Sequence, residues 1–413
     1  MAANQNMSHQ IAIVGGGAGG MSVAAALKRA RPGLDIALIE PSQEQYYQAG
    51  WTLVGGGSMT QAQTVRPRRQ FVPAGVEWLQ HRVAEFSPDQ NQLVLDSGDS
   101  VQYEYLVVAM GIQLDWSKVD GLVDTLGKNG VTSNYQFDLA PYTWECIQTF
   151  KGGKALFTQP PMPIKCAGAP QKILYLAADH WRKNGVNSDV HFFNQGGAMF
   201  GVPFFAKALD GIMKGYNATP HFGHHLVAVD GPGKTATFEL ADGETVTEAF
   251  DMLHVTPPQS APDVIKQSPL ADSGGWLEVD RNTLQHTRYA NVFGLGDCTN
   301  TPNAKTAAAA RAQFPVVSAN LLSTMDSRDQ SGSYDGYGGC PLTVESGKVM
   351  LVEFRYDGEI VPSFNADPRI PRRRYWVLKE RIFPFVYWYG MLRGRDWKYP
   401  VPKLRPAVTT DLE

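Results

Sequence analysis

The alternation of apolar and polar positions predicts a strand, a helix and a second strand at the start of the chain. Four apolar residues at 11–14 predict a short buried strand, and an alanine-rich run at 21–30 predicts a helix. A further apolar run at 35–39 predicts the next strand. Because a helix between two strands is the usual parallel crossover, this stretch is predicted to be the first unit of an α/β sheet.

Glycines make the turn between the first strand and the helix, and an acidic residue follows the second strand. In the spacing GxGxxG the first glycine permits a tight turn, the second a close approach to a pyrophosphate, and the third close helix packing. A carboxylate 20 residues beyond the turn can bind ribose hydroxyls and disfavours NADP, which leaves FAD or NAD. An ordinary glycine-rich turn is the alternative, and the flanking strand, helix and acid argue against it. The candidate binding residues are Gly15, Gly17, Ala18, Gly20 and Glu40.

Two later stretches add to this pattern. A strand at 105–110 ends at Gly111, which resembles a signature of flavin disulfide-reductase-like proteins. Residues 75–88 predict a strand, a turn and a strand, and the resemblance implies that Val83 would lie beside the adenine. A strand at 290–296 is followed by Asp297, which can bind the ribityl chain of FAD. The helix predicted at 305–320 would direct its positive end at the flavin, where Lys305 would add charge unless it is an exposed lysine. The three signatures together indicate FAD rather than NAD.

A second strand–helix–strand scaffold is predicted at 154–194, but its connecting loop is not rich in glycine. The loop contains three prolines and Lys165, which prevent the close backbone approach that a pyrophosphate needs, so NAD(P)H is not expected to be the electron donor. Cys166 stands in this loop, where Lys165 and the helix start would favour its thiolate; a buried, inert cysteine is the alternative. Cys340 lies between glycine and proline, which predicts an exposed cysteine in a flexible loop. Cys146 and Cys298 are predicted to be structural.

Composition excludes several classes of protein. A net charge of −3 over 413 residues gives no case for nucleic-acid binding. The four cysteines are too few for a disulfide framework, and no cysteine or histidine spacing predicts a metal site. The polar residues 1–10 predict neither a signal peptide nor a long transit peptide, and no run of 18 apolar residues predicts a membrane span.

Two segments that are rich in aromatic residues are candidates for contact with a cofactor or a membrane. The loop at 46–57 could lie against a bound cofactor, or it could be a packed surface loop. Residues 369–395 interleave aromatic, aliphatic and basic residues, which is typical of an interfacial membrane segment, although a helix packed on the core is the alternative. Pro384 is predicted to divide this segment into two short helices.

Four segments together resemble the sulfide:quinone oxidoreductases, in the type II branch that includes the mitochondrial enzyme. They read IAIVGGGAGG, PPMPIKCAGAPQKILYL, NVFGLGDCTNTPNAKTAAAARAQ and GYGGCPLTVESGKVMLVEF. The resemblance implies FAD and a redox pair, a disulfide or sulfur-bridged, formed by Cys166 and Cys340. Sulfide would attack on the Cys340 side and leave a persulfide, and Cys166 would pass two electrons to FAD. A thiol, sulfite or a second sulfide would remove the sulfur, and a membrane quinone, near Lys379, Phe383 and Phe385, would reoxidise the flavin.

The expected architecture is α/β, with two Rossmann-like domains as in glutathione reductase and a C-terminal amphipathic segment for membrane attachment. We expect an FAD domain at 9–120 and 285–345, a second domain at 121–284, and a quinone and membrane region at 346–413. The simplest expected location is the cytoplasmic face of a prokaryotic inner membrane, and a homo-oligomer is left open. An NAD(P)H:quinone oxidoreductase and a non-enzymatic sulfur sensor are the alternative functions.

Overall fold

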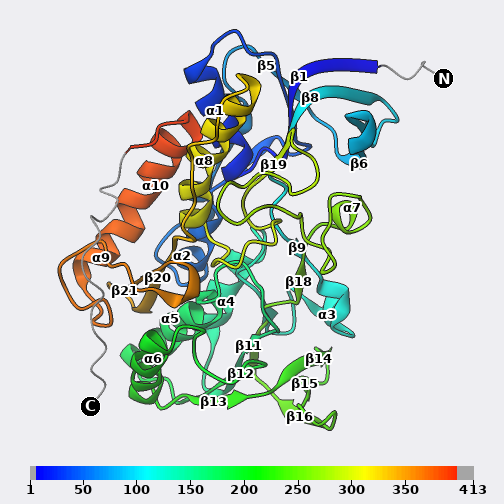
Figure 1. Cartoon of the computed structure of the whole chain (residues 1–413). Helices are drawn as coiled ribbons and strands as arrows, with labels where there is room; N and C mark the ends of the chain where they lie inside the picture. The colour runs from blue at the N-terminus through cyan, green and yellow to red at the C-terminus, as the bar shows by residue number, and fades with distance from the viewer. Residues whose placement is uncertain (1–5, 398–413) are drawn as a thin grey trace.

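The computed structural model describes residues 6–397 and contains two main sheets, one above the other in Figure 1. The strands of the upper sheet run in the order β5-β2-β1-β8-β7-β6, with β19 also paired to β8. The strands of the lower sheet run in the order β10-β17-β11-β12-β13. This arrangement confirms the predicted α/β class with two Rossmann-like sheets.

The strands of the upper sheet are β1 (Asn6–Val14), β2 (Ile36–Ile39), β5 (Val76–Leu79), β6 (Val83–Ser87), β7 (Gln92–Leu95), β8 (Ser100–Val108) and β19 (Val292–Gly294). The strands of the lower sheet are β10 (Val131–Thr132), β11 (Gly153–Gln159), β12 (Ser188–Asn194), β13 (Thr219–Phe222) and β17 (Met252–His254). An antiparallel sheet beside it contains β14 (His225–Asp230), β15 (Thr235–Glu239) and β16 (Thr245–Ala249). The two-stranded pairs are β3 (Glu44–Tyr46) with β4 (Val65–Pro67), β9 (Gln113–Leu114) with β18 (Gln259–Ser260), and β20 (Gly338–Glu345) with β21 (Lys348–Phe354).

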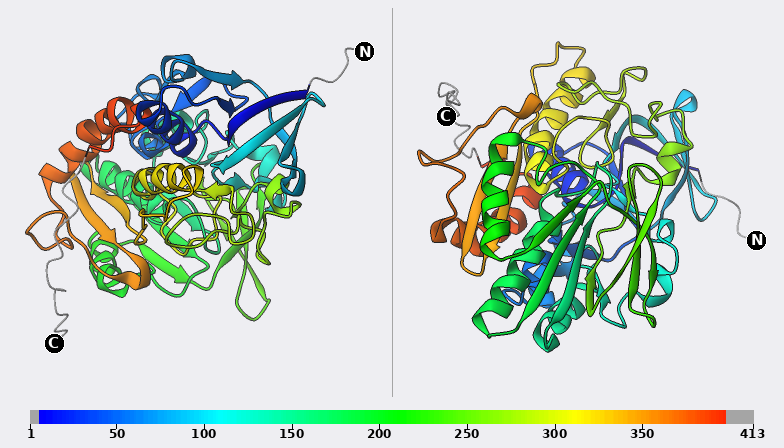
Figure 2. Two further views of the ribbon diagram at one scale, coloured as in Figure 1. Left: turned by 45° about the horizontal axis from the view of Figure 1, so that its top comes forward. Right: turned by 90° about the horizontal axis from the view of Figure 1, so that it is seen from below.

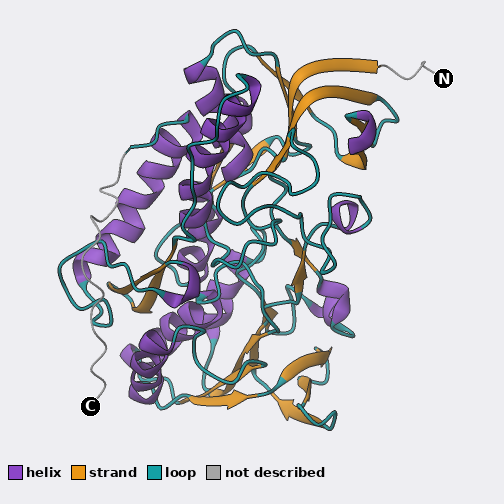
Figure 3. Cartoon of the chain, viewed as in Figure 1, coloured by secondary structure: helices purple, strands orange, loops and turns teal. Residues whose placement is uncertain are grey.

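The helices surround the two sheets, and Figure 3 shows that the segment between β18 and β19 is mostly loop. Their bounds are α1 (Ala18–Ala30), α2 (Trp51–Gly55), α3 (Leu122–Thr125), α4 (Ala140–Thr149), α5 (Ala169–Lys183), α6 (Pro203–Gly215), α7 (Asp263–Lys266), α8 (Ala307–Met325), α9 (Arg373–Val377) and α10 (Phe383–Phe385). Within residues 6–397, no helix is both long enough and apolar enough to cross a bilayer.

Strand β1 lies at the centre of the upper sheet, between β2 and β8 and parallel to both. Its residues Ile11 to Val14 are fully or almost fully buried because helices cover the sheet. The predicted strand–helix–strand unit is therefore confirmed, and its turn lies at the carboxyl end of the central strand. In open α/β sheets this is the edge at which ligands bind.

The hairpin β20–β21 packs against helices that belong to both sheets. It packs on α5 of the lower sheet and on α8, and α9 packs on β21 (Figures 1 and 2). The hairpin crosses the boundary expected at residue 345. This packing brings a strand from near residue 340 to the loop that precedes α5.

Residues 373–393 form one continuous helical segment, here called the tail helix. Turns of π-helix at Leu378–Ile382 and Val386–Gly390 flank α10, and a 3₁₀ turn at Met391–Arg393 ends the segment. The prediction that Pro384 divides the segment is wrong. Proline lacks an N–H and its ring would clash with a carbonyl one turn earlier, but the wider π turn before it removes that conflict without ending the helix.

Candidate functional site

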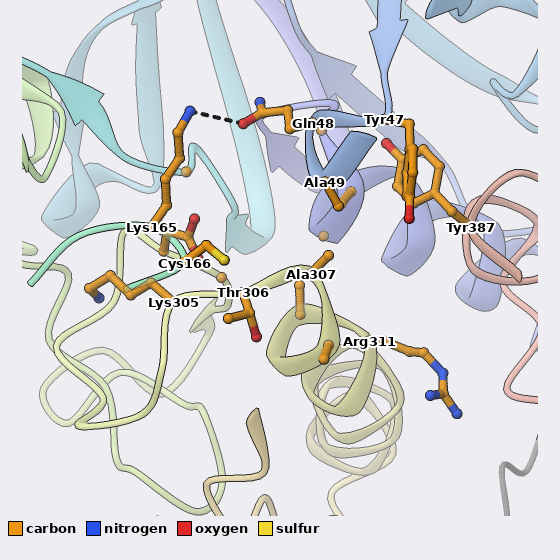
Figure 4. A pocket seen from close by; sticks show the side chains of 18 of the residues that line it. Tyr47, Gln48, Ala49, Lys165, Cys166, Lys305, Thr306, Ala307, Arg311 and Tyr387 are labelled. Carbon is orange, nitrogen blue, oxygen red and sulfur yellow. Dashed lines mark hydrogen bonds between the residues drawn. The ribbon is translucent and has the colours of Figure 1, made fainter. Parts of the chain in front are cut away.

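A cavity of about 460 Å³ connects the glycine turn, the cysteine loop and the tail helix. Its walls come from the β1–α1 turn, the aromatic loop after β3, the loop before α5, the start of α8 and the inner face of the tail helix. Figure 4 shows the central part of this cavity, with Cys166 beside Thr306 at the start of α8, and Tyr387 of the tail helix on the other side of the view. Segments that are far apart in the sequence therefore share one site.

The glycine turn has the close contacts that the motif predicts. A Cβ on Gly15, whose φ is +96°, would lie 2.4 Å from the carbonyl oxygen of Ala109, and a Cβ on Gly20 would lie 1.9 Å from that of Gly15. A Cβ on Gly17 would meet no protein atom within 4 Å, and this residue lines the cavity together with Ala18. The backbone at Gly17 is thus open to a ligand, while its neighbours hold the turn in place.

Glu40 lies at the end of β2 and closes the turn from the other side. Its carboxylate accepts hydrogen bonds from the backbone N–H of Gly16 and of Ser42, each at 2.9 Å. The guanidinium of Arg68 lies 3.7 Å from the same carboxylate and also donates to the carbonyl of Gly16. Arg68 is buried, and this burial lowers its pKa. No sequence signal identified Arg68, which follows β4 with no spacing that relates it to the turn.

Asp297 and the start of α8 form the opposite end of the cofactor side. Both line the cavity, and burial raises the pKa of Asp297, while Lys305 and Lys165 act in the opposite direction. The hydroxyl of Thr306 caps α8 by accepting from the N–H of Ala309 at 3.1 Å, so the positive end of this long helix faces the cavity. The ammonium of Lys305 points away, donating to the carbonyl of Thr299 at 2.8 Å (Figure 4).

Of two further residues predicted to bind the cofactor, Gly111 lines the cavity and Val83 does not. Gly111 has a φ of +73°, lines the cavity and has no protein atom within 4 Å of an added Cβ. Val83 is buried at the start of β6 and packs in the core of the upper sheet, outside the residues that line the cavity.

The aromatic loop after β3 lies against the cavity, where the sequence left open a contact with a cofactor or a packed surface loop. Tyr46, Tyr47, Gln48 and Trp51 all line it. The ammonium of Lys165 crosses to this loop and donates to Oε1 of Gln48 at 3.0 Å, as Figure 4 shows. Burial lowers the pKa of Lys165 to about 8.

Cys166 and Cys340 lie side by side, with their Sγ atoms 3.6 Å apart. Cys166 precedes α5 with a φ of +53°, a left-handed conformation that is unusual for a residue other than glycine. Its N–H donates to the carbonyl of Lys305 at 2.7 Å, which fixes the loop against the segment before α8. Strained backbone of this kind is common at functional sites, where the surrounding contacts hold it in place.

Lys172, rather than Lys165, is the cation at the cysteine pair. It lies in the first turn of α5, and because helical side chains lean toward the N-terminus, its Nζ reaches Sγ of Cys166 at 2.9 Å. The hydrogen bond from Cys340 and the ammonium of Lys172 hold the pKa of Cys166 well below its ordinary value. The same hydrogen bond and burial raise the pKa of Cys340. These contacts favour the thiolate form at Cys166, which lines the cavity, and the thiol form at Cys340, which lies behind it.

The prediction that Cys340 is exposed in a flexible loop is wrong. Cys340 lies on strand β20 and is 2% exposed, because the hairpin packs on α5 and covers the sulfur. Gly168 is what allows this approach, since a Cβ there would lie 2.7 Å from Sγ of Cys340. Cys146 and Cys298 are also buried, and burial raises the pKa of each thiol to about 11.

The tail helix supplies the remaining wall of the cavity. Lys379, Phe383 and Tyr387 line it, and Lys379 is 3% exposed. Burial, assisted by repulsion from Lys172, lowers the pKa of Lys379 to about 7. Phe385 points outward instead: it is 52% exposed and contacts other aromatic rings on the surface.

Comparison with known proteins identifies close relatives. Residues 9–141 match the family model described as pyridine nucleotide-disulphide oxidoreductase. The chain is 43% identical over 390 residues to the mitochondrial sulfide:quinone oxidoreductase of Mus musculus, which covers 94% of this chain and 87% of the relative. It is also 43% identical over 391 residues to that of Dictyostelium discoideum, covering 94% and 86%. The crystal structure of the Aquifex aeolicus sulfide:quinone oxidoreductase has the same fold, with a TM-score of 0.78 at 18% identity over 95% of this chain and 92% of that one.

Proposed function

The chain belongs to the sulfide:quinone oxidoreductase family, and we propose that Cys166 and Cys340 form the redox pair that oxidises sulfide. It is an FAD-dependent oxidoreductase that oxidises sulfide with a quinone as electron acceptor. The observation that supports the assignment of the pair is the 3.6 Å approach of the two sulfurs beside the Lys172 ammonium. Cys166 and Lys172 line the cavity that begins at the glycine turn, and Cys340 lies behind Cys166.

The residues of the cavity fit FAD. The open backbone at Gly17 suits a pyrophosphate, Glu40 suits the ribose, and Asp297 with the positive end of α8 suits the flavin half. Bound here, FAD accepts two electrons from sulfur and passes them to a quinone. Lys305 holds the loop before α8 through Thr299, which supports a structural role for its ammonium.

The two cysteines have different roles in the proposed reaction. Hydrosulfide attack on the bonded pair breaks the bond between the two cysteines, leaves a persulfide on Cys340 and releases Cys166 as a thiolate. Lys172 stabilises this thiolate and so makes Cys166 the leaving group. A thiol, sulfite or a second sulfide then removes the outer sulfur from Cys340, and the pair closes again once two electrons have left.

The quinone site is proposed at the tail helix. Lys379 and Phe383 line the cavity, so they are placed to contact the head group of the quinone. Phe385 lies on the outer face of the helix, where it is placed to contact the membrane surface. The exposed aromatic and aliphatic side chains of the tail helix support contact with a membrane surface. The names of the curated relatives place those proteins in mitochondria, and no observation supports the prokaryotic membrane that the sequence suggested.

Anaerobic mixing with sulfide tests the redox pair. Sulfide should bleach the flavin absorbance of the wild type rapidly, and Cys166→Ser or Cys340→Ser should abolish this bleaching. Cys146→Ser is the matched control, since Cys146 lies in the helix α4 and outside the cavity lining. Normal bleaching in either pair variant would refute the assignment, and bleaching by NADH alone would favour an NAD(P)H:quinone oxidoreductase.

A further inference from the structure

A second cavity, of about 370 Å³, opens on the surface between α1, the loop at 71–74 and the end of the tail helix. Four basic residues line it and no acidic residue does: Lys28, Arg29, Arg393 and Arg395. We call this cavity the basic groove. It lies apart from the cofactor cavity, and the reaction proposed above does not use its residues.

The groove combines positive charge with an apolar floor. The buried side chains of Phe71 and Leu392 form part of its lining, and the guanidinium carbon of Arg393 lies 5.2 Å from the centre of the Phe71 ring. The ammonium of Lys28 already has a hydrogen-bond partner within the protein, because it donates to the carbonyl of Leu34 at 2.8 Å. A ligand of this groove should therefore carry both a negative charge and an apolar part.

Three arginines of the groove form no ion pair within the described part of the chain. Arg29, Arg393 and Arg395 are exposed, and within residues 6–397 none of them forms an ion pair with a carboxylate. Their positions are fixed by the backbone: a Cβ on Gly394 would lie 2.3 Å from the N of Ala26, so the chain crosses α1 where only glycine fits. This crossing holds Arg393 and Arg395 beside Arg29.

The groove continues the exposed apolar face of the tail helix. Phe385 and Tyr389 are 52% and 44% exposed, and their rings lie 5.1 Å apart, with Trp397 stacked on Phe385 at 5.7 Å. Arg393 follows Tyr389 by four residues, which is one helical turn or about 6 Å. An interfacial helix lies in the plane of the membrane, with its apolar face buried about 5–10 Å at the boundary between headgroups and acyl chains and its basic side chains directed to the headgroups. Arg393, one turn along the helix from Tyr389, would therefore lie beside the lipid headgroups that surround this apolar face.

From this juxtaposition we propose that the basic groove binds the phosphate of an anionic phospholipid, whose acyl chains lie along the exposed face of the tail helix. Three exposed arginines on one groove favour a headgroup with net negative charge over a zwitterionic one. The groove would hold the tail helix in one orientation at the membrane, with its inner face toward the cavity. The proposal rests on the membrane contact proposed above and is independent of the cysteine chemistry.

Vesicle flotation of the FAD-containing protein tests the groove. The wild type should bind phosphatidylcholine vesicles that contain phosphatidylglycerol more tightly than vesicles of phosphatidylcholine alone. The variant Arg29→Gln/Arg393→Gln/Arg395→Gln should lose about 100-fold in affinity for the anionic vesicles, because each basic side chain near an anionic surface contributes about fivefold. Its binding to neutral vesicles should persist. Flavin absorbance and Tm verify its fold; if it fails to fold, Arg395→Gln alone should lose about fivefold.

A charge-matched control separates a site from general attraction. Lys128→Gln/Lys151→Gln/Lys207→Gln removes three exposed positive charges from the part of the chain that carries the lower sheet, and it should keep the preference for anionic vesicles. Equal losses in the two variants would overturn the groove in favour of diffuse charge. Wild-type protein without any preference would also overturn it, and wild-type protein that binds neither vesicle would overturn the membrane contact as well.

Free inorganic phosphate carries the same charged group as a lipid headgroup and is the alternative ligand of the basic groove. Inorganic phosphate, compared with chloride at constant ionic strength, should neither raise the Tm of the wild type nor release it from anionic vesicles. If it does both, the groove is a site for soluble phosphate and the lipid assignment is wrong. Sulfide-dependent reduction of a water-soluble quinone, measured in parallel without vesicles, shows independently whether the enzymatic proposal stands.

Discussion

Replacement of Lys172 by methionine tests what keeps the cysteine pair reactive. Nζ of Lys172 lies 2.9 Å from Sγ of Cys166, and the residue is 2% exposed. Methionine keeps an unbranched side chain in the same space and removes the charge. The Cys166 thiolate then loses its charge-assisted hydrogen bond, so the pKa of Cys166 should rise toward its ordinary value.

The size of the effect follows from the lost interaction. A hydrogen bond to a charged group contributes about 1.5–3 kcal/mol, which corresponds to a roughly 10- to 100-fold smaller thiolate population near neutral pH. Alkylation by iodoacetamide follows the thiolate, so its rate at Cys166 should fall by a similar factor. The low-pH limb of sulfide-dependent activity should move to higher pH in the same variant.

The assay is anaerobic alkylation of the reduced, FAD-containing protein over a range of pH, with the Cys166 peptide quantified by mass spectrometry. Lys165→Met is the matched control, because Lys165 precedes Cys166 in the chain but directs its ammonium to Gln48 at 3.0 Å. The reasoning is refuted if Lys165→Met slows alkylation of Cys166 as much as Lys172→Met does. It is also refuted if neither variant changes the pH dependence.

Three further substitutions test other contacts of the site. Gly168→Ala places a Cβ 2.7 Å from Sγ of Cys340, so sulfide-driven flavin reduction should slow at least about tenfold in a folded protein. Gly20→Ala places a Cβ 1.9 Å from the carbonyl oxygen of Gly15, which should cost about 2–3 kcal/mol of stability and reduce the FAD retained per chain. Lys379→Met should stabilise the protein in denaturant unfolding, most below pH 7. There the buried ammonium, whose pKa is lowered from 10.5 to about 7, costs up to about 5 kcal/mol.

The sign of the Lys379 effect follows from proton binding. Between pH 7 and 10.5 the unfolded chain holds this proton and the folded protein does not, so the stability of the wild type should rise with pH through that window. A Lys379→Met variant whose stability relative to wild type is the same at both ends of the window would contradict the burial argument. For the two glycines, Gly197→Ala and Gly33→Ala are controls, since a Cβ at either would meet no atom within 4 Å; comparable losses there would contradict the contacts.

The sequence was sufficient to predict the cofactor end of the fold. Residues 11–40 contain the whole strand–turn–helix–strand unit, and the constraint on Gly20 is local, since its close contact is with Gly15 in the same turn. Periodicity identified β1, α1 and β2 for the same reason. The close contact at Gly15, by contrast, is with Ala109, which follows β8. Pro384 was misjudged because proline was considered alone, whereas the π turn before it depends on how the tail helix packs.

The cysteine site could be predicted only in part, because its contacts join distant segments. Cys166 and Cys340 are 174 residues apart, and their approach depends on the packing of the β20–β21 hairpin on α5. No local pattern around Cys340 announces that packing, so glycine and proline neighbours suggested a loop. Lys172 was missed because the sequence favours the adjacent Lys165, while the left-handed backbone at Cys166 turns the sulfur back toward α5.

The tail helix has two faces with different environments, and this division links the cofactor cavity to the surface. Lys379 and Tyr387 face inward, where the phenol of Tyr387 donates to the carbonyl of Tyr46 at 2.6 Å and so ties the helix to the aromatic loop. Phe385 and Tyr389 face outward at positions between and beyond them. Because one helix forms both the cavity wall and the exposed apolar face, a quinone that leaves a bilayer at this face has one helix diameter, about 10 Å, to cross before it reaches the cavity. A membrane contact elsewhere on the molecule would leave that apolar face in water, and this is the physical reason for proposing the quinone entrance here.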